Sequence, residues 1–116
     1  TCALPIFYGI ICRKCQGIVY VGETERTVRE RLTEHLADIR HARDKPVGTH
    51  FNQQNHTLSD MRAVVIQQIY ETNKIYRRIV ENQWIGRLGT EHPRGLNCKN
   101  SFTMACEGLT NTITLP

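Results

Sequence analysis

Residues 6–22 read IFYGIICRKCQGIVYVG, and this stretch decides the fold. It holds two runs rich in β-branched and aromatic residues, at positions 6–12 and 18–23, separated by a short turn that contains Gly17. Such a pair of runs predicts a β-hairpin. Because side chains alternate along a strand, Tyr8 and Tyr20 can share one face of this hairpin. Two phenols on one face make the hairpin the first candidate for a functional surface.

Two helices are predicted directly after the hairpin. Thr27 and Glu30 form a capping-box pattern, which predicts a helix that continues to about residue 42. Pro46 then begins a short helix that reaches Phe51.

A third strand and a long helix complete the predicted fold. Residues 61–70 carry a nearly continuous apolar run, which predicts a central strand buried on both faces. Thr72 or Asn73 caps a helix that continues to about Leu88, and a short strand is predicted at 111–115. We therefore expect an α/β domain in which a small antiparallel three-stranded sheet is flanked by helices.

Length and composition limit the possible classes of protein. The 116 residues suit a single domain, with a core expected over about residues 6–100. The formal net charge of +4 favours an anionic partner. Five cysteines, an odd number with one C-x-x-C pair, favour a reducing compartment over a disulfide framework. No apolar run reaches 18 residues, so we expect no transmembrane helix. Because the chain begins without Met, we expect it to be a domain excised from a longer protein.

Five short motifs occur in an order that resembles the GIY-YIG nuclease domain. They are Ile6-Phe7-Tyr8, Tyr20-Val21-Gly22, Arg31-Leu32-x-x-His35, Glu81 and Asn97. Ile6 and Phe7 replace the glycine and isoleucine of the family, so the first motif keeps only its tyrosine. The resemblance covers roughly residues 6–100. It implies a GIY-YIG-like fold and a DNA endonuclease that hydrolyses phosphodiester bonds.

The resemblance also implies roles for site residues. The expected catalytic set is Tyr8, Tyr20, Arg31, His35, Glu81 and Asn97. Glu81 would hold one divalent cation, and a single carboxylate suits Mg²⁺ (or Mn²⁺) with its retained water ligands. Arg31 would bind the scissile phosphate through its planar guanidinium. Tyr8 would accept the proton of the attacking water or orient that water, provided that nearby cations lower the pKa of its phenol. Tyr20 and His35 would complete the hydrogen bonds.

The sequence resembles most closely the GIY-YIG domains of Penelope-like retroelements. Their hairpin carries two cysteines, and two histidines follow, as do Cys12, Cys15, His50 and His56 here. Four such ligands leave no position for water, so the resemblance implies a structural zinc site. It further implies a nuclear enzyme that nicks target DNA for insertion of the element. A reverse transcriptase domain would lie elsewhere in the same parent protein.

Basic residues around the first helix and on the hairpin turn are candidates for contacts with DNA phosphates. They are Arg13, Lys14, Arg26, Arg29, Arg40, Arg43 and Lys45. The alternative is a solvated helix face, because Glu30, Glu34 and Asp38 lie among them.

Other interpretations remain open from the sequence. Glu81 could form an ion pair with Arg77 or Arg78, one turn earlier on the helix. The C-x-x-C pair could be free, with unrelated surface histidines. The whole chain could be a zinc-stapled nucleic-acid-binding module that has lost catalysis, or a zinc-bound protein-interaction domain.

Overall fold

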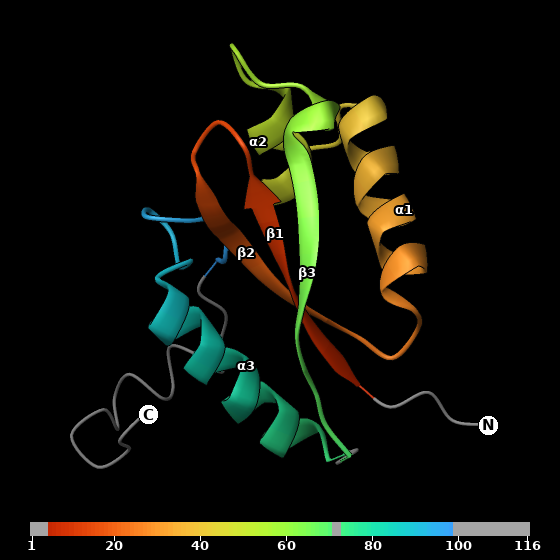
Figure 1. The fold of residues 1–116 in the computed structure, drawn as a ribbon, viewed down its shortest axis with the longest axis vertical. Coiled ribbons are helices and arrows are strands. Elements are labelled where there is room, and N and C mark those ends of the chain that lie inside the picture. Colours follow the sequence, from red (N-terminus) through yellow and green to blue (C-terminus); the bar gives the residue numbers. More distant parts are fainter. Residues whose placement is uncertain (1–4, 71–72, 99–116) are drawn as a thin grey trace.

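The computed structural model describes residues 5–70 and 73–98, so the strand expected at 111–115 lies outside the described residues. The elements are β1 (Ile6–Cys12), β2 (Gly17–Thr24), α1 (Val28–Arg40), α2 (Pro46–Asn52), a 3-10 turn (Leu58–Asp60), β3 (Met61–Gln68) and α3 (Lys74–Leu88). The three strands form one antiparallel sheet with helices around it (Figure 1). The expected α/β fold is confirmed.

The strand order is β2-β1-β3, so β1 is the central strand and β3 is an edge strand. The prediction of a central strand over residues 61–70 is therefore wrong, and β3 ends at Gln68. Phe7 and Ile10 of β1 are fully buried, whereas 56% of Val65 on β3 is exposed. Both β1 and β3 carry long apolar runs. Hydrophobicity within one segment does not specify which strand acquires two neighbours, because pairing is a non-local contact.

The two faces of the sheet pack against different helices. On one face, Tyr8 and Ile10 of β1 belong to the larger core with Ile39 of α1 and with Val47 and Phe51 of α2. The apolar stripe predicted for the first helix joins this core through Val28, Leu32, Leu36 and Ile39. Hydrophobic burial here fixes α1 across the face that carries the tyrosines.

On the opposite face, Phe7 of β1 packs with Ile69 and with Val80 of α3, and Trp84 covers this smaller cluster. Trp84 Nε1 also donates a hydrogen bond of 2.9 Å to Oε1 of Gln67, at the end of β3. The third helix is thus held to the sheet by apolar contacts supplemented by a polar one.

The helix ends follow the sequence signals closely. The Thr27 hydroxyl accepts a hydrogen bond from the Glu30 amide at 3.1 Å, and α1 ends at Arg40, two residues earlier than expected. Asn73 caps α3 by accepting hydrogen bonds from the Ile75 and Tyr76 amides. Within residues 5–70 and 73–98, no helix combines the length and hydropathy needed to cross a bilayer.

The strand order can be tested by comparing two truncations on the same sheet face. Ile10→Ala removes a fully buried side chain from the central strand and should lower the free energy of unfolding by about 2–5 kcal/mol. Val65→Ala on the exposed edge should cost less than about 1 kcal/mol. Chemical denaturation measures both values. Equal losses would indicate that the third strand is as buried as its sequence suggests.

Candidate active site

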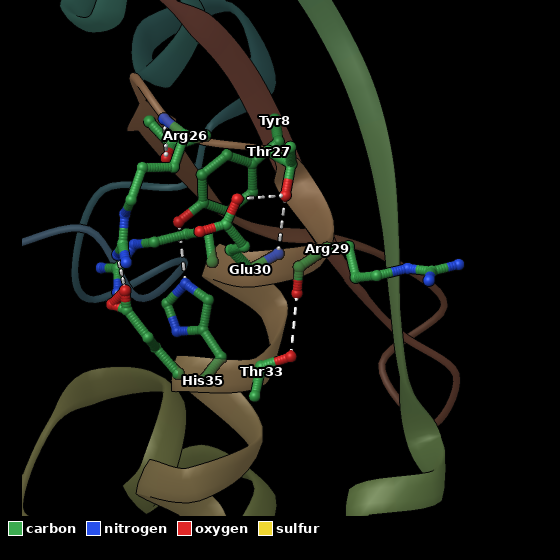
Figure 2. Close-up of polar contacts among 10 residues, drawn as sticks. Tyr8, Arg26, Thr27, Arg29, Glu30, Thr33 and His35 are labelled. Carbon is green, nitrogen blue, oxygen red and sulfur yellow. Dashed lines mark hydrogen bonds and ion pairs between the residues drawn. The ribbon is translucent and has the colours of Figure 1, made fainter. Parts of the chain in front are cut away.

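The hairpin and α1 bring three aromatic rings together. Tyr8 Oη is hydrogen-bonded to Nε2 of His35 at 2.8 Å (Figure 2). The His35 ring centroid lies 5.8 Å from that of Tyr8 and 5.7 Å from that of Tyr20, both in edge-on geometry. The expectation that both tyrosines share one face is confirmed, and the face is the one covered by α1.

Gly22 of β2 is the direct cross-strand partner of Tyr8. A Cβ atom built on Gly22 would lie 2.3 Å from Oη and 2.4 Å from Cζ of Tyr8. The phenol therefore occupies the space that any other residue at position 22 would need. This contact gives a steric reason for the Tyr-Val-Gly motif.

Burial sets the protonation state of the two phenols. The pKa of Tyr8 is raised by burial and by its neighbour Tyr20, and Arg31 lowers it by a smaller amount. The pKa of Tyr20 is also raised, mainly by burial, against an opposing effect of Arg31. The expected influence of Arg31 is thus present, but it does not overcome burial. Both phenols are protonated at neutral pH.

His35 is shifted in the opposite direction by the same cause. Burial lowers the pKa of its imidazole to about 4, with further lowering by Arg31 and Lys45 and an opposing effect of Asp38. Its Nδ1 atom is buried and has no hydrogen-bond partner among the described residues. At neutral pH the imidazole is uncharged and can accept a proton.

Glu81 of α3 completes the site from the side of β2. Its carboxylate raises the pKa of both phenols, so it acts on the same group of residues. Burial, and then Glu23, raises the pKa of Glu81 to about 7, while Arg78 opposes the shift. A cation at this carboxylate would relieve the cost of keeping it charged.

Arg77 is a buried residue of the site that the sequence interpretation assigned only as a possible partner of Glu81. Its guanidinium pairs instead with Glu25 at 2.5 Å and with Glu23 at 3.8 Å, both at the end of β2. These pairs hold α3 against β2, and Glu81 lies one turn further along the same helix. The sequence signal that could have identified Arg77 is a charged residue one turn before Glu81, on the buried face of α3.

Asn97 is bound to the backbone of β2. Its Oδ1 accepts hydrogen bonds from the Val21 amide at 2.9 Å and from the Thr90 hydroxyl at 2.7 Å, and its Nδ2 donates to the Val21 carbonyl at 2.9 Å. The side chain therefore ties the segment after α3 to the strand that carries Tyr20. In this structure Asn97 positions the site through β2.

A second cluster lies at the hairpin turn. Ligand atoms of Cys12, Cys15, His50 and His56 all lie within 4.8 Å of one another. The Cys15 Sγ atom is 3.7 Å from Nε2 of each histidine. The tertiary structure thus brings together four residues that are spread over more than forty positions of the chain. A Cys₂His₂ cluster of this kind is compatible with zinc.

The outer nitrogens of both histidines have their own contacts. His56 Nδ1 lies 3.2 Å from the Gln54 carbonyl, and His50 Nδ1 lies 3.2 Å from the side-chain amide of Gln53. The His56 contact is of the type that orients a metal-binding imidazole, because the Gln54 carbonyl oxygen can accept the Nδ1 proton. Burial also lowers the pKa of His50, with a further contribution from His56, and the neutral imidazole is the form that binds a metal.

The seven basic residues are all exposed, as DNA contacts require, but they do not form a single free patch. Arg26 pairs with Glu34, and Arg43 pairs with Asp38 at 3.0 Å. Figure 2 shows the Arg29 side chain pointing away from Tyr8 and His35. Acidic neighbours therefore neutralise part of this surface, as the alternative interpretation expects.

A model of the GIY-YIG catalytic domain family matches residues 5–97. The chain belongs to this family. Among solved structures, the catalytic domain of the homing endonuclease I-TevI matches with a TM-score of 0.64 and 21% identity, over 83% of this chain and 99% of that chain. At this identity the likeness bears on the fold. No curated protein matches the chain. As a GIY-YIG domain, the protein is a DNA endonuclease.

The shifted pKa of His35 predicts how stability depends on pH. Between about pH 6.5 and about pH 4 the unfolded chain binds a proton at His35 and the folded chain does not. The His35 contribution to stability should therefore fall as pH falls through this window, by about 1–3 kcal/mol after allowance for solvent screening, while the raised pKa of Glu81 acts in the opposite direction below about pH 7. Denaturation curves across the window should lose this component in His35→Gln. His41→Gln, at an exposed histidine, should retain it, and identical slopes for all three proteins would contradict the assignment.

Proposed function

We propose that this domain is a divalent-metal-dependent endonuclease that nicks target DNA for the insertion of a Penelope-like retroelement. The observation that carries the catalytic part is the gathering of five residues from three parts of the fold. Tyr8 and Tyr20 come from the hairpin, Arg31 and His35 from α1, and Glu81 from α3. Tyr8, Tyr20, Arg31 and His35 lie at the face where Tyr8 meets α1, and the Glu81 carboxylate acts on both phenols from α3.

The proton path begins at Tyr8. Its phenol is protonated and bonded to a neutral imidazole, so it can donate its proton to His35 Nε2 while its oxygen accepts the proton of an attacking water. In this arrangement Tyr8 relays the proton and His35 receives it. The relay avoids the free phenolate that burial disfavours, and the Tyr20 ring also packs edge-on against His35.

Arg31 is the permanent charge of the site. Its charge acts on both phenols, and its planar guanidinium suits the oxygens of a phosphodiester. Held there, the scissile phosphate would face the Tyr8 oxygen, where water loses its proton. The exposed basic residues would hold flanking phosphates with little dependence on sequence.

Glu81 would hold the divalent cation. The donor chemistry fits, because a carboxylate that burial and Glu23 make costly to ionise gains from a bound cation. When bound there, magnesium supplies Lewis acidity to the phosphate and stabilises the leaving oxygen. A single carboxylate suits this ion, which keeps much of its hydration shell.

Cys12, Cys15, His50 and His56 would hold a structural zinc ion. For zinc bonds of normal length, the sulfur–nitrogen edge of a tetrahedron is about 3.6 Å. The two distances from Cys15 Sγ, both 3.7 Å, match this edge. The site would join the hairpin turn to α2 through His50 and to the loop before β3 through His56, and so fix the strand that carries Tyr8.

The biological setting follows from the resemblance to Penelope-like elements. One active site per domain favours cutting of a single strand, which would leave an end for reverse transcription. We therefore propose a reverse transcriptase domain in the same parent protein and a nuclear site of action. The Cys₂His₂ cluster supports this subtype. Family membership does not favour an inactive nucleic-acid-binding or protein-interaction module.

The active site is tested by nicking of a supercoiled plasmid in the presence of magnesium. Arg31→Ala and Glu81→Gln should each lower the rate by about 10²–10³-fold. Arg31→Ala removes the cation that would bind the phosphate, and Glu81→Gln removes the carboxylate that would hold the divalent cation. The Arg29 side chain on the same helix points away from the site. Arg29→Ala should therefore weaken cutting only a few-fold, in a salt-dependent manner. Undiminished nicking by both site variants would show that the reaction occurs elsewhere.

The zinc site is tested by elemental analysis together with thermal unfolding. Purified protein should contain one zinc per chain, and Cys15→Ser should lose it and several kcal/mol of stability. Cys98→Ser, also at an exposed cysteine but outside the cluster, should keep both. Wild-type protein with much less than one zinc per chain, or equal behaviour of the two variants, would refute the structural zinc.

A further inference from the structure

Glu34 lies between two arginines at the edge of the active site. Its Oε2 accepts a hydrogen bond from Nη1 of Arg31 at 3.2 Å, and its Oε1 forms an ion pair with Nη2 of Arg26. Arg31 and Glu34 face the same side of α1 because they are three residues apart. Arg26 precedes the helix, and Figure 2 shows its side chain running along the first turns of α1 toward His35.

Arg31 is therefore shared between two sets of neighbours. On one side its charge lowers the pKa of the Tyr8 and Tyr20 phenols, and on the other its guanidinium binds the carboxylate of Glu34. A carboxylate and a phosphodiester present similar oxygen pairs to a guanidinium. In the free protein, Glu34 thus binds the Arg31 guanidinium that the phosphate would need during catalysis.

We propose that Glu34 is a specificity-determining residue that holds Arg31 in the DNA-free enzyme and releases it to the scissile phosphate. This inference rests on the proposed function, in which Arg31 binds that phosphate. Only a phosphate that is also held by flanking contacts displaces the carboxylate efficiently. Glu34 therefore favours a continuous DNA strand over isolated anions.

The exposure of the three side chains makes this exchange feasible. The exposed fractions are 29% for Arg31, 39% for Glu34 and 54% for Arg26, so solvent screens both ion pairs. Exposed pairs of this kind are weak, whereas a planar contact between arginine and phosphate is strong and directional. The phosphate should therefore displace Glu34 from Arg31. Because this ion pair must break first, Glu34 lowers the affinity for DNA.

The charge balance gives the sign of the effect. After displacement the Glu34 carboxylate stays near the bound phosphate and repels it, and before displacement it competes for Arg31. Glu34→Gln removes both effects while keeping the size of the side chain. The variant should bind DNA more tightly, and its kcat should hardly change because the bound phosphate still meets Arg31.

The experiment compares Glu34→Gln with Asp44→Asn, which removes the same charge at an exposed position in the turn after α1. Fluorescence anisotropy with a short DNA duplex, without added magnesium, measures affinity without cleavage. Plasmid nicking at fixed ionic strength then gives KM and kcat. Glu34→Gln should bind up to about five-fold more tightly than Asp44→Asn and lower KM by the same factor, with kcat within about two-fold of wild type. In an Arg31→Gln background this gain should shrink to the part that comes from repulsion between Glu34 and the bound phosphate.

Three results would overturn the inference. The first is that Glu34→Gln and Asp44→Asn bind DNA with equal affinity. The second is a gain in affinity that persists in full without Arg31. The third is a large loss of kcat at unchanged KM, which would mean that Glu34 positions Arg31. Failure of the proposed function looks different. In that case wild-type protein would not nick DNA at all, while the anisotropy comparison would still show whether Glu34 competes with DNA.

Discussion

The hydrogen bond between Tyr8 and His35 is the contact on which the rest of this structure depends. It joins the central strand to α1 in the larger core, where Tyr8 is fully buried. The phenol can reach His35 only because Gly22 leaves room for it on the neighbouring strand. Steric fit, core packing and the candidate chemistry are therefore parts of one arrangement, and a change at any of these positions affects the others.

Burial also explains the electrostatic character of the site. It raises the pKa of Tyr8 and of Glu81 and lowers that of His35, in each case by disfavouring the charged form. The result is a group of mostly neutral donors and acceptors beside the permanent cation Arg31. In the proposed function, such a site would bind a phosphate through that cation and move protons between neutral partners.

Three further contacts hold the candidate catalytic residues in place from outside the site. Arg77 ties α3 to the end of β2, and Asn97 ties the segment after α3 to the backbone beside Tyr20. The Cys₂His₂ cluster brings the hairpin turn to the loop before β3. The first two contacts both bind β2 and the third lies at the hairpin turn, so together they hold the strands that carry Tyr8 and Tyr20. The ion pair between Glu34 and Arg31 is partly exposed to solvent and is suited to exchange with a ligand.

The sequence by itself determined the local elements and the identity of the chemistry. The hairpin, the Thr27 and Asn73 caps and the motif order through Glu81 are encoded by neighbouring residues or fixed spacings, so they could be predicted. Only the tertiary structure decided that β1 is central, that Arg77 pairs with β2 and that Asn97 binds the Val21 backbone. It also decided that burial outweighs Arg31 at Tyr8. Each of these depends on contacts between distant segments, and no pattern within one segment records which partner it will meet.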